Sequence, residues 1–211
     1  DADREVHQPP RDDEVAHDAR AAGFRYAVLD AHGISNASPR PIYDVYAPVV
    51  SPSGLVLFGR DRETATQVWS ATEGYPGDPW YRDFHRDIGF DRPDDEVAAF
   101  RPPGSPRVPT GIKYHRITGA TTDKALYDPA RAAERVRTHA THFVAARTAQ
   151  VARLAAQMDR PPLVVCPYDA ELFGHWWHEG LAWLDGVLRG LAATYDVRTT
   201  TLGSALARAA V

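Results

Sequence analysis

The chain has 211 residues, of which 44% are hydrophobic and 25% charged, and its formal net charge at pH 7 is −4. This composition is typical of a globular domain, and no run of about 18 apolar residues predicts a transmembrane helix. Because the slight acidity offers no basic footprint for phosphates, we expect neither a nucleic acid nor a membrane as a partner.

The single cysteine and the start of the chain give information about the cellular compartment of the protein. Cys166 is the only cysteine, so no internal disulfide can form, and no signal peptide is visible. We therefore expect a cytoplasmic protein. Residues 1–13 are charged, contain prolines and lack periodicity, which predicts an irregular or disordered end. Since the first residue is Asp1 and the only methionine is Met158, we expect a piece of a longer protein, and the oligomeric state stays open.

The N-terminal part of the chain alternates helical patterns with short apolar runs. Between two apolar runs lies a stretch rich in Pro, Ser and Asn, and loops of this length are usually functional or disordered. The predicted elements are a helix over 14–22, a strand over 24–29, a loop over 33–53, a strand over 55–59 and a helix over 62–70.

The C-terminal part begins with a proline-rich region and continues with a long amphipathic helix that Pro129 opens. Pro161 and Pro162 separate this helix from a further apolar run. The predicted elements are irregular structure over 71–111 with a short helix near 81–87 and no regular structure over 101–110, a strand over 112–117, a helix over 129–158, a strand over 163–166, a helix over 179–193, a strand over 197–200 and a helix over 202–208.

Strands that alternate with helices indicate an α/β fold built on a parallel sheet. In such folds the active site lies at the carboxyl ends of the strands. Four polar residues follow predicted strands, namely Asp30, His32, Arg60 and Asp169. The sequence therefore predicts a site at this edge of the sheet.

The segment with the densest chemistry runs Tyr-Asp-Ala-Glu-Leu-Phe-Gly-His-Trp-Trp-His-Glu-Gly over residues 168–180. Two adjacent tryptophans cannot both face one core from a helix. One of Trp176 and Trp177 can therefore line a cleft, where a flat indole suits the apolar face of a sugar ring. Both can equally be partly buried packing residues.

Asp169 comes directly after a predicted buried strand. A carboxyl group near aromatic and apolar groups is less readily ionised, which suits a general acid. Aspartate is also a preferred helix N-cap, and a helical segment follows this residue. On position alone, both interpretations remain open.

A metal site is a further interpretation of the same segment. His175 and His178, with Glu171 or Glu179, have a spacing that can place two imidazoles on one face. We favour no metal, because no second histidine cluster with a neighbouring acid supports them, and we expect Cys166 to be an inert buried thiol.

The 168–180 segment resembles the fourth conserved region of glycoside hydrolase family 57, most closely that of its 1,4-α-glucan branching enzymes. Shorter segments agree with that family in the same order, and the resemblance covers nearly the whole chain from about Asp13 onward. These segments are Gly23–Tyr26, Leu29–His32, Gln67–Ser70, Gly74–Gly77 and Tyr127–Pro129.

The resemblance implies a partial (β/α)7 barrel with parallel strands and long functional loops, formed by residues 14–211 as its C-terminal half. It implies an α-glucan substrate, cleavage of α-1,4 bonds and formation of α-1,6 bonds with retention of configuration, and no metal or organic cofactor. Asp169 matches the family's general acid/base. The remaining candidate substrate-binding residues are Tyr43 on a covering loop, Trp69 of the Gln-Val-Trp segment, Arg60, His175 and Trp177.

One departure from the family is important. A retaining enzyme needs a nucleophilic carboxylate about 5–5.5 Å from the acid/base, and the family's Trp-Leu-Pro-Glu-like nucleophile motif is absent from these 211 residues. We therefore expect this chain alone to be inactive. The alternatives are a non-catalytic glucan-binding remnant, an α-amylase or 4-α-glucanotransferase of the same family, and a metal-dependent hydrolase built on His175 and His178.

Overall fold

The computed structural model describes residues 12–70 and 72–208. They form two compact units. Unit 1 takes the described residues of the ranges 1–62, 153–167 and 202–211, and unit 2 takes those of 63–152 and 168–201. Residues 1–13 were expected to be irregular. Residues 1–11 of this range lie outside the described residues, and residues 12 and 13 belong to a helix.

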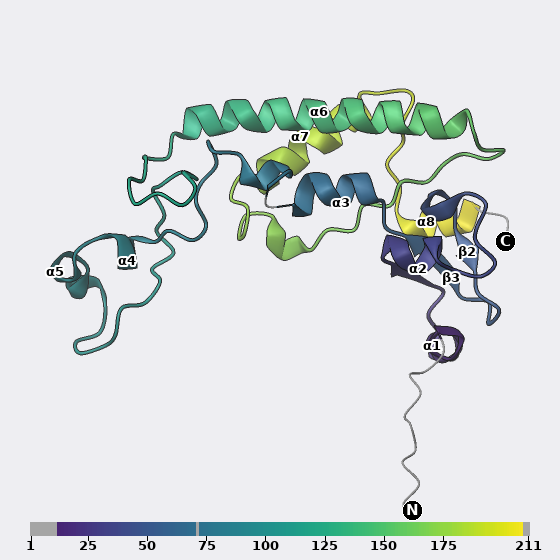
Figure 1. Cartoon of the computed structure of the whole chain (residues 1–211), viewed down its shortest axis with the longest axis horizontal. Coiled ribbons are helices and arrows are strands. Elements are labelled where there is room, and N and C mark those ends of the chain that lie inside the picture. The colour runs from purple at the N-terminus through teal and green to yellow at the C-terminus, as the bar shows by residue number, and fades with distance from the viewer. Residues whose placement is uncertain (1–11, 71, 209–211) are drawn as a thin grey trace, which may run out of the picture. The chain divides into compact units, whose positions relative to one another are not determined.

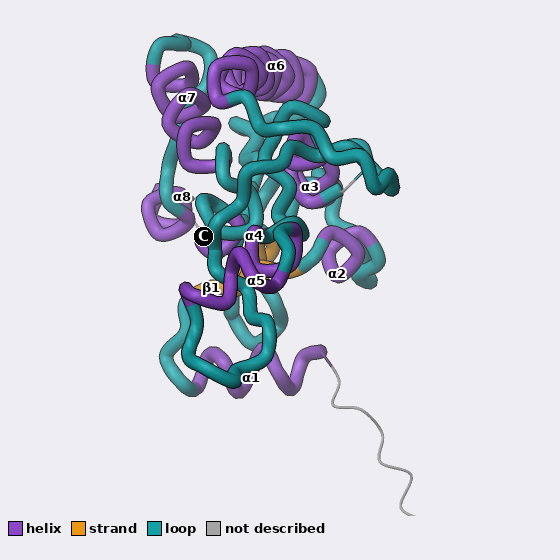
Figure 2. The backbone as a smooth tube through the Cα atoms, turned by 90° about the vertical axis from the view of Figure 1, so that its left-hand side faces the viewer, coloured by secondary structure: helices purple, strands orange, loops and turns teal. Residues whose placement is uncertain are grey.

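Unit 1 contains a small mixed sheet of β1 (Tyr26–Leu29), β2 (Val49–Val50) and β3 (Val56–Gly59), in the order β1-β3-β2. Figure 1 labels β2 and β3, and Figure 2 labels β1. β1 and β3 are parallel, with Tyr26 opposite Val56. β2 is antiparallel to β3. The expectation of parallel strands is therefore right for β1 and β3 and wrong for β2, which a chain reversal places beside its neighbour.

Hydrophobic residues of the sheet pack against α2 (Ala31–Ser35), the 3-10 turn η1 (Asp44–Tyr46) and α8 (Leu202–Arg208). Unit 1 also contains α1 (Asp12–Ala21). Ala31, Ile34 and Val45 form one buried cluster, and Phe58 with Leu206 belongs to another. Burial of these side chains supplies the driving force that holds the short strands together.

Two sequence predictions for unit 1 need correction. The expected loop over 33–53 contains the end of α2, η1 and β2, because its apolar residues find partners on the sheet. The expected strand over 163–166 is extended chain outside the sheet. Even so, the Leu163 N–H donates to the Tyr46 carbonyl and the Val165 carbonyl accepts from the Asp61 N–H, both at 2.9 Å.

Unit 2 is built around the long helix α6 (Pro129–Ala155), whose residues up to 152 belong to this unit, with α3 (Arg62–Trp69) and α7 (Gly180–Ala192). Figures 1 and 2 both show α7 alongside α6. The two helices approach closely because α7 carries glycines at the contact. A Cβ atom added to Gly186 would lie 3.0 Å from the Ala140 Cβ, and one added to Gly190 would lie 2.8 Å from a Val144 methyl.

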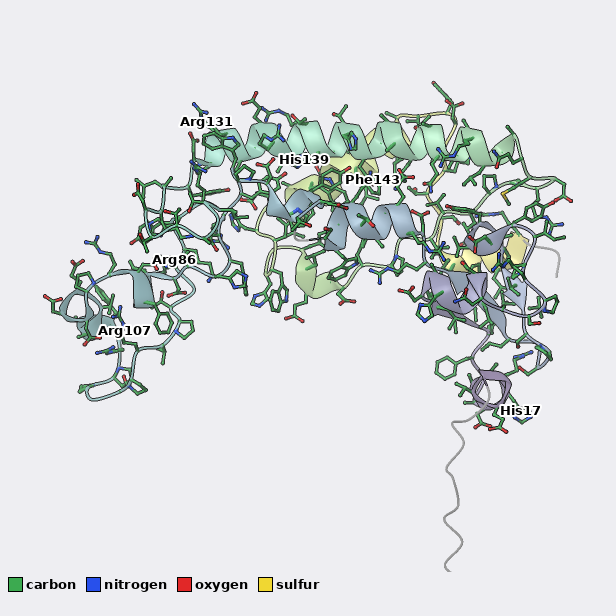
Figure 3. The ribbon with its side chains drawn as sticks, viewed as in Figure 1. His17, Arg86, Arg107, Arg131, His139 and Phe143 are labelled. Carbon is green, nitrogen blue, oxygen red and sulfur yellow. The ribbon has the colours of Figure 1, made fainter. Side chains whose placement is uncertain are left out.

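Aromatic side chains fill the core of unit 2. Phe143 of α6 packs edge-on against Trp183 of α7, which is fully buried, with ring centroids 5.1 Å apart. Tyr75 contacts Phe143 and stacks on His139. His139 and Phe143 lie one turn apart on α6 (Figure 3). Burial raises the pKa of Tyr75 to about 12. Trp177, which belongs to the 168–180 segment, is also part of this core. The core therefore holds that segment in place.

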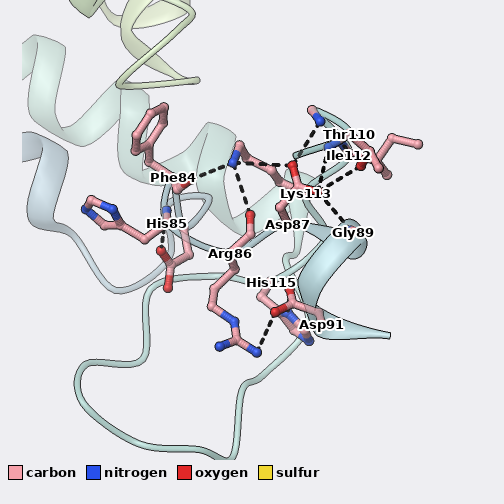
Figure 4. A network of polar contacts seen from close by, with 12 residues as sticks. Phe84, His85, Arg86, Asp87, Gly89, Asp91, Thr110, Ile112, Lys113 and His115 are labelled. Atoms are coloured by element: carbon pink, nitrogen blue, oxygen red, sulfur yellow. Dashed lines mark hydrogen bonds and ion pairs between the residues drawn. The ribbon is translucent and has the colours of Figure 1, made fainter. Parts of the chain in front are cut away.

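Between α3 and α6 the chain makes a long excursion that contains only short helical turns. They are η2 (Tyr75–Gly77), α4 (Ile88–Asp91), α5 (Asp94–Val97) and η3 (Ala98–Phe100). The Asp87 carboxylate organises the excursion by accepting hydrogen bonds from the backbone N–H groups of Gly89, Thr110 and Gly111 (Figure 4). Buried polar contacts of this kind replace a regular core in a loop.

Several elements in unit 2 differ from the sequence predictions. No helix covers 81–87, and the predicted strand over 112–117 is reduced to isolated bridges at His115 and Arg116. The predicted strand over 197–200 is irregular. The lack of regular structure over 101–110 is confirmed. Alternating apolar residues predict a strand only where a neighbouring strand is available to pair with it.

The described residues show a three-stranded sheet, and the seven-stranded barrel stays a prediction. Among the residues that the structure describes, no helix has the length and apolar character needed to cross a membrane.

Candidate active site

The 168–180 segment folds as a compact reversal of the chain in unit 2. It begins with the 3-10 turn η4 (Ala170–Leu172) and turns at Gly174, which has a φ of +86° that favours glycine. The Trp177 N–H donates to the Leu172 carbonyl, and the Gly174 N–H donates to the Trp177 carbonyl, both at 2.8 Å. The side chains of the motif therefore project from one rigid loop.

Asp169 stands at the start of this loop with an exposed side chain. Its backbone is extended, and its carboxylate accepts no capping hydrogen bond from η4. Within residues 12–70 and 72–208, the carboxylate has no hydrogen-bond or ion-pair partner. The N-cap interpretation is therefore wrong, and the expected apolar surroundings are absent. A carboxylate that is exposed and not engaged elsewhere can exchange a proton with a bound substrate.

The two adjacent tryptophans have opposite environments. Trp177 is only 2% exposed and packs against Phe173, Tyr81 and Trp183. Trp176 is 50% exposed and stacks on Phe84, with ring centroids 4.6 Å apart. Trp177 is therefore a core residue that a substrate cannot reach in this structure. Of the two, Trp176 is the residue that faces solvent.

The histidines of the motif do not form a metal site with their neighbours. His175 is exposed, with its Nε2 3.9 Å from the Glu171 carboxylate. Burial lowers the pKa of His178, which contacts Tyr127. Glu179 is buried and accepts a hydrogen bond from the Arg82 N–H. In the described part of the chain, no three His, Cys, Asp or Glu side chains gather closely enough to hold a metal ion.

A second polar cluster lies in unit 1, where the parallel strands β1 and β3 end side by side. Asp30 follows β1, and His32 Nδ1 lies 3.1 Å from its carboxylate. Arg60 follows β3 with its guanidinium 3.9 Å from the same carboxylate. The hydrogen bond from His32 is the main reason why the pKa of Asp30 is lowered. The structure thus brings together three of the four predicted strand-end residues.

The two remaining candidate residues, Tyr43 and Trp69, belong to different units. Tyr43 in unit 1 is half-buried, and the Arg160 guanidinium lies 5.3 Å from the centre of its ring. A hydrogen bond from Tyr43, added to the stronger one from Arg160, lowers the pKa of Asp159. Trp69 ends α3 in unit 2 and is 39% exposed. Both side chains keep surface that a ligand can contact.

Sequence reasoning missed Phe84, which supports Trp176. Phe84 lies in the long excursion, and the Lys113 ammonium group is 4.9 Å from the centre of its ring. Nothing in the local sequence signals this role, because the two aromatic residues are far apart along the chain. The adjacent tryptophans in the motif indicated only that one of them can face away from the core.

Comparisons with known proteins agree with the motif. No protein-family model matches the chain. The 1,4-alpha-glucan branching enzyme TK1436 of Thermococcus kodakarensis is 40% identical over an alignment 194 residues long that covers 85% of this chain and 26% of that enzyme. The crystal structure of a GH57-type branching enzyme from Pyrococcus horikoshii has a TM-score of 0.74 at 35% identity, covering 92% of this chain and 32% of that one.

The resemblance to glycoside hydrolase family 57 is confirmed. The crystal structure of the alpha-amylase AmyC from Thermotoga maritima is also similar, with a TM-score of 0.83 at 41% identity, over 90% of this chain and 37% of AmyC. The chain spans about a quarter to a third of the length of the curated relatives that it matches. Within this chain, unit 1 contains the Asp30, His32 and Arg60 cluster, and unit 2 contains Asp169.

Proposed function

We propose that this chain supplies the acid/base part of a family 57 site that transfers α-glucan chains, with Asp169 as the general acid/base. The observation that carries the proposal is the Asp169 carboxylate, which is exposed and without a partner among the described residues. It stands on a loop that hydrogen bonds and Trp177 hold in place. The names of the similar proteins, branching enzymes and an amylase, support an α-glucan as the substrate.

The proposed reaction uses Asp169 twice. Its protonated carboxyl group donates a proton to the leaving glycosidic oxygen while a carboxylate nucleophile forms a bond to the anomeric carbon. The resulting carboxylate then takes a proton from the acceptor's 6-hydroxyl, whose oxygen displaces the nucleophile. Because no segment of these 211 residues resembles the family's nucleophile motif, we propose that the nucleophile lies outside this chain and that the chain alone is inactive.

Branching is the activity that we favour over hydrolysis. The three curated relatives are named as branching enzymes, two of them as probable ones. The alternatives are an amylase or 4-α-glucanotransferase activity, with AmyC as the similar structure that favours an amylase, and a glucan-binding remnant. We propose that Tyr43 shields the intermediate from water, and that Arg60, Trp69 and His175 contact the glucan. We do not propose that Trp177 contacts the glucan, because it is buried.

A chimera tests the proposal. In it, this chain replaces the matching segment of the T. kodakarensis branching enzyme, to which it is 40% identical. We expect the chimera to form α-1,6 bonds in amylose, detected by proton NMR, and the Asp169→Asn chimera to lose this activity while still binding glucan. Asp196→Asn, the same change at another exposed aspartate of unit 2, is the matched control and keeps the activity. Full activity of the Asp169→Asn chimera would show that the acid assignment is wrong.

A further inference from the structure

The indole of Trp176 is the most exposed of the five tryptophans in the chain. We propose that its outer surface, with Glu171 and His175 at its edge, is a binding subsite for one glucose unit of the glucan beside Asp169. This inference rests on the proposed function. It assigns a sugar contact to Trp176, because Trp177 is buried and a sugar cannot reach it.

Polar and aromatic contacts fix the indole in place before any ligand binds. Its Nε1–H donates to the Glu171 carboxylate at 3.0 Å. Its ring stacks on Phe84 at an interplanar angle of 28°. A side chain held in this way loses little conformational freedom when a ligand binds, so more of the contact energy contributes to affinity.

The support beneath Trp176 is itself anchored. Lys113 Nζ donates to the carbonyl oxygens of Phe84 and Arg86, at 2.5 and 3.1 Å, and lies 3.8 Å from the Asp87 carboxylate (Figure 4). Burial alone would raise the pKa of Asp87, but hydrogen bonds from Thr110, Gly89 and Gly111 hold it below its usual range. The carboxylate therefore stays ionised and keeps the Lys113 contacts in place.

The edge of the platform has the chemistry of a sugar site. Glu171 keeps acceptor capacity beyond its bond to the indole, and the exposed His175 ring can donate or accept. His175 packs edge-on against both Phe84 and Trp176, with centroids 5.5 and 5.7 Å apart. An apolar plate bordered by hydroxyl-binding groups matches a pyranose ring, which has apolar C–H faces and a rim of hydroxyl groups.

The platform is within reach of the acid. Glu171 is two residues after Asp169, so their Cα atoms are no more than about 7 Å apart. Because Glu171 contacts the Trp176 indole directly, a short oligosaccharide can contact the platform and Asp169 together. Three other tryptophans of unit 2 are less suited, since Trp177 and Trp183 are buried and the guanidinium groups of Arg116 and Arg131 lie over Trp80.

Calorimetric titration of the 211-residue chain with maltoheptaose tests the subsite. We expect saturable binding by the unsubstituted chain and about tenfold or more weaker binding by Trp176→Ala, the size of loss typical of a tryptophan at the centre of a binding surface. Trp176→Phe keeps a flat ring on Phe84 and should retain most of the affinity. Tyr195→Ala, which removes a fully exposed aromatic ring elsewhere in unit 2, is the matched control and should bind as the unsubstituted chain does.

Tryptophan fluorescence provides a second readout. We expect maltoheptaose to change the emission of the unsubstituted chain and to change that of Trp176→Phe less, because Trp69 is then the one remaining tryptophan that we propose to contact the glucan. Unaltered affinity of Trp176→Ala, in a chain that binds maltoheptaose, would overturn the subsite and leave the proposed function standing. No binding by the unsubstituted chain would overturn both, and equal losses in Trp176→Ala and Tyr195→Ala would also overturn the subsite.

Discussion

Adjacent residues of the 168–180 motif have different roles because one side chain is buried and its neighbour is half-exposed. Trp177 points into the aromatic core of unit 2, while Trp176 stays half-exposed on Phe84. Asp169 faces solvent on the same loop. Stability and substrate contact are thus assigned to different side chains within a few residues, so substitutions can separate the two.

Truncation of the two tryptophans should have unequal effects on stability. Trp177→Ala leaves a cavity in the core and should lower the free energy of unfolding by about 3–5 kcal/mol. Trp176→Ala removes a half-exposed ring and should cost well under half of that. Urea denaturation followed by circular dichroism measures both. Equal losses would show that the two indoles are similarly buried in solution.

A pH effect is expected from His139, which is half-buried on α6. Arg135 donates to its Nε2, so its Nδ1–H donates to the Tyr81 hydroxyl at 2.8 Å. Burial is the main reason why the pKa of His139 is lowered. The unfolded chain therefore binds more protons than the folded one below about pH 6.5, and the free energy of unfolding should fall as the pH drops from there.

His139→Asn tests this pH effect because asparagine keeps the hydrogen bond to Tyr81 and cannot titrate in this range. We expect denaturant unfolding of this variant to depend less on pH between 7 and 5. Part of the slope should remain, because burial also lowers the pKa of His178. An unchanged slope would mean that His139 titrates normally in the folded chain.

At the residue scale, the sequence predicted what depends on local order along the chain. Asp30, His32 and Arg60 meet because each follows one of two adjacent parallel strands. The choice between Trp176 and Trp177 could not be made from the sequence, since it depends on Phe84 and Trp183, which reach the motif only through the tertiary fold.

Among the elements, the contact between α6 and α7 depends on small residues at matching four-residue intervals. Gly186 and Gly190 of α7 meet Ala140 and Val144 of α6. Contacts this close leave no room for a larger side chain on α7.

The same substitution at two helical glycines should have opposite effects. Gly186→Leu forces atoms against the Ala140 Cβ and should destabilise the chain by about 1–3 kcal/mol. Gly203→Leu in α8, where no atom lies within 4 Å of the added Cβ, should be neutral or stabilising by up to about 1 kcal/mol. Thermal melts compare the pair. A stabilising Gly186→Leu would contradict the close helix contact.

The long helices were predictable because their apolar residues repeat over several turns, as at Val136, Ala140 and Phe143 of α6. The errors fall on short apolar runs. Residues 163–166 and 112–117 have strand-like sequences, but a strand also needs a neighbour in register, and pairing of this kind is not written in local sequence.

For the molecule as a whole, the described residues form two units, each with its own packed core. The chain corresponds to only part of its relatives. We propose that Asp169 supplies the proton that glucan transfer requires.

The most direct test is the ratio of α-1,6 bond formation rates in the T. kodakarensis chimera with aspartate or asparagine at position 169. Loss of general acid/base catalysis should lower the rate about 10²- to 10⁴-fold, with maltoheptaose affinity unchanged. The control chimera with Asp196→Asn should keep a rate within a few-fold of the unsubstituted chimera. Equal rates with aspartate and asparagine would show that Asp169 is not the general acid/base.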